Sequence, residues 1–172
     1  MSPEKEISHI ERDRLFLGPV EAVCDPHIIK HCLDKYENHP KGCPNWGHKE
    51  GCPPNVRHFS RVYAKEVFVV AIRFNFAAYL SLRRQAHPNW TDRALKNPRH
   101  WQGHLRHELN DFLFKHLSEH EEIDGEIILS PEAMGVDLFA TCEKVGIHLE
   151  RNPQNYVYKV ALIARKLNEN RS

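Results

Sequence analysis

The sequence has no long apolar run and no excess of charge of one sign. Its most hydrophobic stretch, residues 67–72, is far too short to cross a bilayer, which takes about 20 apolar residues. The N-terminal residues MSPEKEISHIERDR are polar, so we expect no secretory signal and a soluble, cytoplasmic protein. Lysine and arginine number 24 against 23 aspartate and glutamate, a formal net charge of +1. Without a strong overall field, neither nucleic acid nor a membrane is an expected partner.

Familiar catalytic signatures are also missing. The sequence contains no glycine-rich phosphate loop, no nucleophile elbow and no HExxH zinc motif. It has no internal repeat and no low-complexity tract. The 172 residues are 41% hydrophobic and 27% charged, which are ordinary proportions for one globular domain. We therefore expect a single domain over residues 1–172, without a recognisable acid/base pair or cofactor motif.

Helical and extended patterns alternate through the second half of the chain. They predict an α/β or α+β fold, in which helices cover a small sheet. Residues 67–74 are β-branched and aromatic, as in a buried central strand, and residues 125–130 and 155–164 predict further strands. Apolar residues recur at helical spacing over about residues 98–120. A second helix is predicted from Ser130, ending at Gly146.

The remaining segments are less regular. Residues 1–14 are predicted to form a polar leader, and residues 15–23 a short strand broken at Gly18-Pro19. Residues 75–85 fit either a continued strand or a helix. Residues 86–98 are predicted to form a polar loop. The core is expected over residues 57–172, and residues 24–56 are expected to be an irregular cysteine-rich metal loop with a turn of helix at 27–36.

Four of the five cysteines fall within the proline-rich residues 24–56: Cys24, Cys32, Cys43 and Cys52. This stretch buries little apolar surface, and metal ligation would supply the order that it lacks. The spacing matches neither a zinc ribbon nor the ferredoxin run. In a reducing compartment, clustered thiols indicate metal more than disulfides. Buried structural thiols and a disulfide framework remain the alternatives.

Four thiolates suit either a 4Fe-4S cluster or Zn²⁺. We favour the 4Fe-4S cluster, because Cys-Pro pairs also occur beside the ligands of iron–sulfur proteins and wide spacing suits a cluster several ångströms across. Four cysteine ligands would saturate the cluster. Three ligands, for example Cys32, Cys43 and Cys52, would leave one iron open to a substrate.

Residues 43–54 read C-P-N-W-G-x4-C-P-P. This motif resembles the hallmark of a family of uncharacterised predicted metal-binding proteins, found mainly in anaerobic archaea and bacteria. A second stretch, SPEAMGVDLFATCEKVGI at 130–147, is similar to that family's S-M-E-A-x-G-I-D-V-F segment. The resemblance covers roughly residue 32 to the C-terminus, so that Cys24 lies outside it. It implies a metal centre and no particular reaction. The residues in register in the second stretch are Glu132, Ala133, Gly135, Val136, Asp137 and Phe139.

The chain departs from the family's pattern in the middle, where the family has additional cysteines. No cysteine lies between Cys52 and Cys142. The predicted long helix instead has His100, His104 and His107 on one face. These histidines are a candidate second metal site, with a solvated polar face as the alternative. Cys142 is expected to be a buried structural thiol, or else a further ligand.

Three functions are consistent with these features. The first is an iron–sulfur module that transfers electrons or serves as an accessory subunit of a larger anaerobic complex, so that a protein partner is expected. The second is an enzyme with an open iron site for sulfur or substrate chemistry. The third is a zinc-stapled protein-interaction domain.

Overall fold

A computed structural model describes residues 7–35 and 39–168. These residues form two compact units, each made of separate stretches of the chain. The first six residues of the predicted polar leader and Tyr36, at the end of the predicted turn of helix, lie outside the described residues. The first unit comprises 7–16, 70–123 and 149–160, and the second comprises 17–35, 39–69, 124–148 and 161–168.

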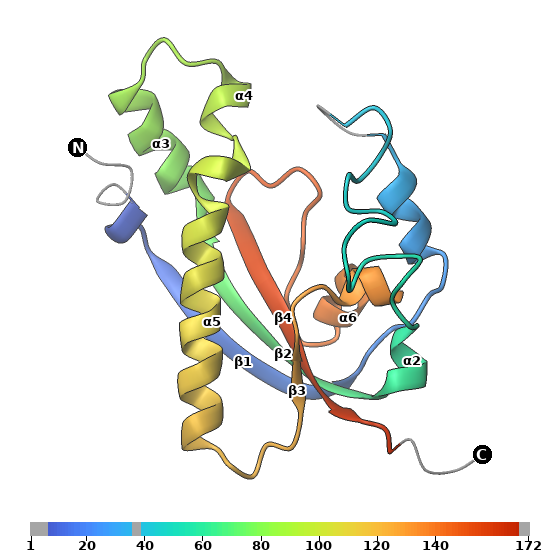
Figure 1. The fold of residues 1–172 in the computed structure, drawn as a ribbon. Helices are drawn as coiled ribbons and strands as arrows, with labels where there is room; N and C mark the ends of the chain where they lie inside the picture. The colour runs from blue at the N-terminus through green and yellow to red at the C-terminus, as the bar shows by residue number, and fades with distance from the viewer. Residues whose placement is uncertain (1–6, 36–38, 169–172) are drawn as a thin grey trace. The chain divides into compact units, whose positions relative to one another are not determined.

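The described strands form one four-stranded antiparallel sheet with the order β1-β2-β4-β3 (Figure 1). In the pairing of β3 with β4, Glu126 lies opposite Ala164. The antiparallel pairing identifies the fold class as α+β, which confirms that form of the prediction. No helix in the described part of the chain is long and apolar enough to cross a bilayer. The strands are β1 (Arg12–Glu21), β2 (Tyr63–Asn75), β3 (Glu126–Ile128) and β4 (Tyr156–Lys166).

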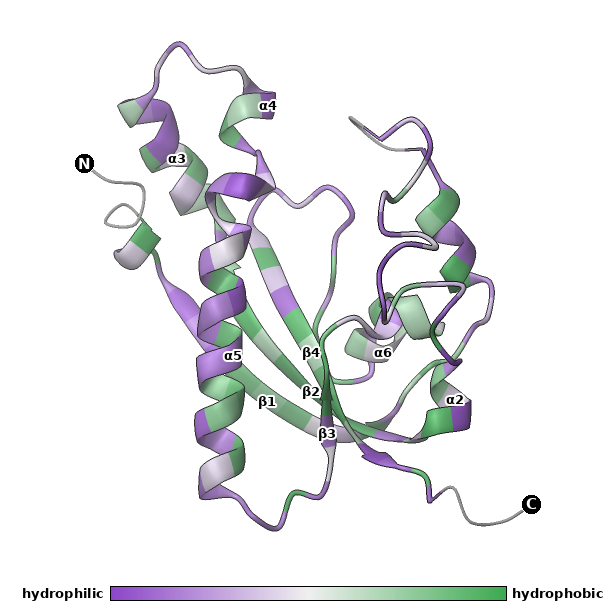
Figure 2. Cartoon of the chain, viewed as in Figure 1, coloured by the Kyte–Doolittle hydropathy of each residue, from purple (hydrophilic) through white to green (hydrophobic). Residues whose placement is uncertain are grey.

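The interior strands β2 and β4 hold much of the buried apolar surface. Residues 69–72 of β2 are completely buried, as the continuous β-branched run predicted. Residues 160–164 of β4 are also buried. Figure 2 shows the hydrophobic colouring along both strands. The predicted central strand at residues 67–74 is therefore confirmed.

Two helices follow β2 in the first unit. Helix α3 (Phe76–Ala86) begins at Asn75, whose side-chain oxygen accepts a backbone N–H of the first turn. Helix α4 (Asp92–Leu95) is capped in the same way by Thr91. Such caps satisfy N–H groups that have no partner inside the helix. The segment that fitted either strand or helix is therefore a helix, and the expected polar loop contains a helical turn.

The long helix of the first unit is α5 (Gln102–Glu119), which follows a short 3₁₀ turn, η2 (Pro98–His100). Leu105, Leu109 and Leu113 succeed one another at intervals of four, and all are completely buried. This spacing places them on one face of the helix. In Figure 2, α5 alternates between hydrophobic and hydrophilic colour, as an amphipathic helix does. The predicted helix and its core face are confirmed.

The second unit contains mostly short elements and the cysteine-rich segment. Its two distant parts are joined by backbone hydrogen bonds. Asp25 donates its N–H to the carbonyl of Gly135 at 2.8 Å, and Asp137 donates to the carbonyl of Val23 at 2.7 Å. The residues around Cys24 are thereby held against residues 135–137. The short elements are η1 (Ile28–Leu33), α2 (Phe59–Val62), η3 (Pro131–Met134) and α6 (Leu138–Glu143).

Two predicted boundaries in this unit are wrong. The single helix expected from Ser130 to Gly146 is divided into η3 and α6, because Gly135 adopts a left-handed φ of 84° that ends the first turn. The strand expected to break at Gly18-Pro19 continues through both residues. Glycine permits this continuation because any other residue at position 18 would place its Cβ 3.0 Å from the carbonyl oxygen of Val67, which is a tight contact.

Candidate metal centre

The first turn of the cysteine-rich segment is η1, and Cys32 lies near its end. The chain then returns so that the N–H of Cys43 donates to the carbonyl of Cys32 at 2.7 Å. A Cβ at Gly42 would lie only 2.7 Å from that same carbonyl oxygen. Gly42 is therefore required for the backbone to pass so close to Cys32, and its φ of 83° is one that glycine adopts without cost.

The motif that begins at Cys43 forms a closed loop. The N–H of Trp46 donates to the carbonyl of Cys43 at 3.2 Å, and the N–H of Gly47 donates to the carbonyl of Pro53 at 2.8 Å. The second bond joins the Trp-Gly step to the Cys-Pro-Pro end of the motif. Cys43 therefore opens the first turn of the motif, and Cys52 lies within the loop that the bond from Gly47 to Pro53 closes.

Two of the other predicted ligands, Cys43 and Cys52, act electrostatically on Cys32. Burial raises the pKa of the Cys32 thiol, and the Cys43 and Cys52 thiols and the Glu132 carboxylate raise it further. An effect of this kind on Cys32 requires proximity, because charge interactions weaken with distance. We call Cys32, Cys43 and Cys52 the three-thiol group. Each of its members is half-buried, and all five cysteines of the chain are free thiols.

The donor atoms of this group suit a soft metal. Thiolates bind Zn²⁺ and the irons of iron–sulfur clusters, and the pKa shift shows that Cys32 loses its proton at a cost unless a cation compensates. A positive charge among the three sulfurs would remove that cost. Within residues 7–35 and 39–168, no three His, Cys, Asp or Glu side chains are already arranged to hold one ion. The fit of the group to a metal therefore rests on its thiol chemistry and on the effect of Cys43 and Cys52 on Cys32.

Cys24 has a different environment from the three-thiol group. It forms an isolated backbone bridge with Val136, and its sulfur lies 3.9 Å from the carbonyl oxygen of Ala22. Burial raises the pKa of Cys24, Lys65 acts in the opposite direction, and Glu21 adds to the increase. None of the three grouped thiols contributes. Cys24 remains a predicted ligand that the structure places among other charges.

Glu132, which is in register in the stretch 130–147, was not expected to be a ligand. It is an exposed residue of η3, and its carboxylate raises the pKa of both Cys32 and Cys142. Carboxylate oxygen is a metal ligand in its own right. Sequence spacing could not show this role, because Glu132 lies 100 residues after Cys32 in the chain. Glu132 is therefore the one carboxylate that we add to the candidate site.

Cys142 is a buried thiol of α6 with 0% of its surface exposed. Burial is the main cause that raises its pKa to about 12, with contributions from Glu132 and Glu143. A thiol with this pKa is almost entirely protonated at neutral pH and is a poor nucleophile. The expectation of a buried structural thiol agrees with this environment.

The second motif is shaped by Gly135 and Asp137. A Cβ at Gly135 would lie 2.4 Å from Nε2 of His58, so the imidazole occupies the space that a side chain would need. Asp137 caps α6, because its carboxylate accepts the N–H of Ala140 at 2.9 Å. Gly135 thus leaves room for the His58 ring and Asp137 begins α6, both in the same unit as the three-thiol group.

The candidate histidine site lies in the first unit. His100 belongs to η2, whereas His104 and His107 belong to α5, so the three residues are not on one continuous helix. Burial lowers the pKa of His100, and the charges of Arg83 and His87 lower it further. The His100 ring packs beside Trp90, with 5.3 Å between the ring centroids. The structure therefore associates His100 with these neighbours, and the second metal site stays a prediction.

Comparisons with protein-family models, with curated proteins and with solved structures give no match to this chain.

Proposed function

We propose that this chain is a metal-binding protein in which Cys32, Cys43 and Cys52 hold a 4Fe-4S cluster. The observation that carries the proposal is the closeness of the three thiols: the N–H of Cys43 donates to the carbonyl of Cys32 at 2.7 Å, and the Cys43 and Cys52 thiols raise the pKa of Cys32. Three thiols on a proline- and glycine-rich loop have no role in packing a core, because each of them is only half-buried. A metal centre accounts for their grouping.

The protein's own residues would hold and shield such a centre. The bond from Gly47 to Pro53 fixes the ends of the loop, so that less conformational entropy is lost when the thiols bind. Thiolate ligation would release the three protons, and the cluster would supply one-electron chemistry. We assign the module to electron transfer or to an accessory role in a larger anaerobic complex, with a protein partner and a cytoplasmic location.

A second candidate function is an enzyme with an open iron site. The separate environment of Cys24, among Lys65 and Glu21, favours it because three ligands leave the fourth position of a cluster without a cysteine. Glu132, whose carboxylate raises the pKa of Cys32, would be a carboxylate available beside such a cluster. In this version the open iron would bind a substrate or a sulfur species.

The test is elemental analysis of anaerobically purified protein. About four irons and about four acid-labile sulfides per chain are expected, with the visible absorption of a 4Fe-4S cluster. Cys32→Ala, Cys43→Ala and Cys52→Ala should each lose the cluster. Cys24→Ala is the matched control, since it should retain iron and sulfide if three cysteines ligate. A single zinc ion would instead identify the zinc-stapled interaction domain, and a metal-free protein that takes up neither metal would refute the proposal.

A further inference from the structure

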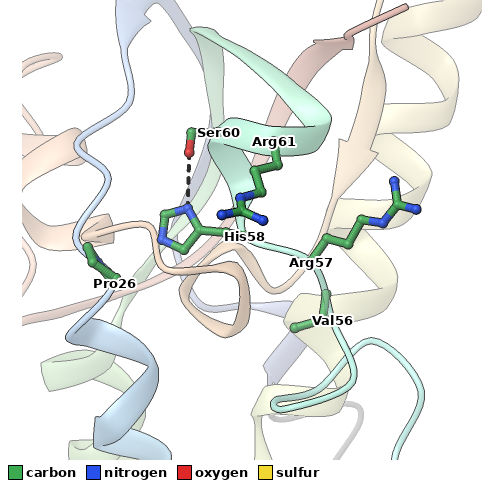
Figure 3. A pocket seen from close by; sticks show the side chains of 6 residues that line it. All are labelled: Pro26, Val56, Arg57, His58, Ser60 and Arg61. Carbon is green, nitrogen blue, oxygen red and sulfur yellow. Dashed lines mark hydrogen bonds between the residues drawn. The ribbon is translucent and has the colours of Figure 1, made fainter. Parts of the chain in front are cut away.

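An open pocket lies in the second unit, beside the segment that follows the cysteine motif (Figure 3). Its volume is about 690 Å³, within the range of sites that bind small molecules. The titratable residues that line it are all basic, and no acidic residue is among them. The lining residues are Pro26, Val56, Arg57, His58, Ser60 and Arg61.

The two arginines give this pocket its charge. Both are exposed, and they contribute guanidinium groups from positions four residues apart. In Figure 3 the side chain of Arg61 extends toward the His58 ring, whereas that of Arg57 extends toward the other side. A guanidinium group binds phosphate through two parallel N–H donors, and its charge is permanent. The pocket therefore attracts an anion although the whole chain has a formal net charge of only +1.

Ser60 adds a hydroxyl group whose direction His58 controls. Nδ1 of His58 and Oγ of Ser60 are 3.1 Å apart. When Nδ1 carries a proton it donates to Oγ, and the hydroxyl proton of Ser60 is then available to a ligand oxygen. The ring itself is held in place, because its buried Nε2 lies against Gly135. His58 is thus a positioning residue for Ser60.

We infer that this pocket binds a small molecule that carries a phosphate group. The Arg61 guanidinium and the Ser60 hydroxyl supply donors for oxygens of one phosphate group, and Arg57 adds a further positive charge to the lining. Pro26 and Val56 supply apolar surface for the remainder of the molecule. The pocket is too large for inorganic phosphate alone to fill. This inference is independent of the metal proposal, because none of the lining residues is a cysteine.

The experiment is calorimetric titration of the full-length protein, as purified, with phenyl phosphate, inorganic phosphate and benzoate. Phenyl phosphate should bind most tightly, inorganic phosphate more weakly, and benzoate least. Arg61→Gln should weaken the binding of phenyl phosphate by about tenfold or more, the loss expected when one charge-assisted contact worth about 1.4 kcal/mol is removed. Ser60→Ala should weaken it to a smaller extent.

The matched control is Arg106→Gln, which removes the same charge from an exposed position on α5. Its affinity for phenyl phosphate should equal that of the wild type. An equal loss in both arginine variants would overturn the inference, since the attraction would then be non-specific. Benzoate that binds as tightly as phenyl phosphate, or the absence of any binding, would also overturn it. Arg61→Gln should retain its metal content and melting temperature, so a misfolded variant is recognised directly.

Discussion

Replacing Gly135 by alanine should destabilise the second unit through two separable effects. The first is backbone strain, because φ at this position is 84° and an L-residue in the left-handed region costs about 1–2 kcal/mol. The second is steric, because the new Cβ would lie 2.4 Å from Nε2 and 2.9 Å from Cδ2 of His58. Overpacking of this kind costs typically about 1–3 kcal/mol. We expect a total loss of about 2–5 kcal/mol in the free energy of unfolding.

Urea denaturation followed by far-ultraviolet circular dichroism measures this loss. Gly51→Ala is the control for strain alone, since its φ is 79° and nothing lies within 4 Å of the Cβ position. A double-mutant cycle with His58→Ala isolates the steric part, because the smaller side chain leaves room for Cβ. The reasoning is refuted if Gly135→Ala is no more destabilising than Gly51→Ala, or if its penalty is unchanged in the His58→Ala background.

Three further predictions concern the core and two titrating side chains. Leu109→Ala should lower the free energy of unfolding by about 2–5 kcal/mol in urea denaturation, because Leu109 is completely buried. Phe114 is 80% exposed, so Phe114→Ala should change this free energy by less than about 0.5 kcal/mol. Similar losses in the two variants would contradict the assignment of the core face. Because burial raises the pKa of Cys142 to about 12, only about one thiol in ten thousand is ionised at pH 8. Iodoacetamide should therefore modify Cys142 only after the protein is unfolded, as measured by peptide mass spectrometry. Rapid modification in the native protein would contradict the burial of this thiol. Because burial lowers the pKa of His100, the unfolded chain binds a proton there more readily than the folded chain, and stability should fall as pH drops below about 6.5. Melting temperatures of His100→Gln should depend on pH more weakly than those of the wild type. An unchanged pH dependence would exclude His100 as the cause.

The best-predicted parts of the fold are those whose pattern is long and continuous. The apolar run of β2 and the four-residue spacing of Leu105, Leu109 and Leu113 each have one interpretation, and both are confirmed. The division at Gly135 was missed because a glycine inside a helical pattern does not by itself show that its φ is positive. The start of α3 had a usable signal in Asn75, a good capping residue, but the strand before it gave no clear end.

The candidate sites depend on the sequence to different extents. The cysteine motif predicted an irregular loop over residues 24–56, whereas the backbone bonds that join Cys43 to Cys32 and Gly47 to Pro53 could not be predicted from it. The contribution of Glu132 could not be predicted in the same way, because it depends on a contact between segments about 100 residues apart in the chain. The phosphate pocket was missed for the same reason, since Pro26 joins residues 56–61 only after folding.

The loop between Gly47 and Cys52 offers a practical opportunity. The side chains of residues 48–51 are exposed, while the hydrogen bonds that close the loop come from backbone groups alone. A small fluorophore attached to an amino acid introduced at position 49 would therefore occupy solvent and leave the loop closure intact. Quenching of its emission during titration with iron and sulfide would follow assembly of a centre in real time, without relying on the centre's own colour.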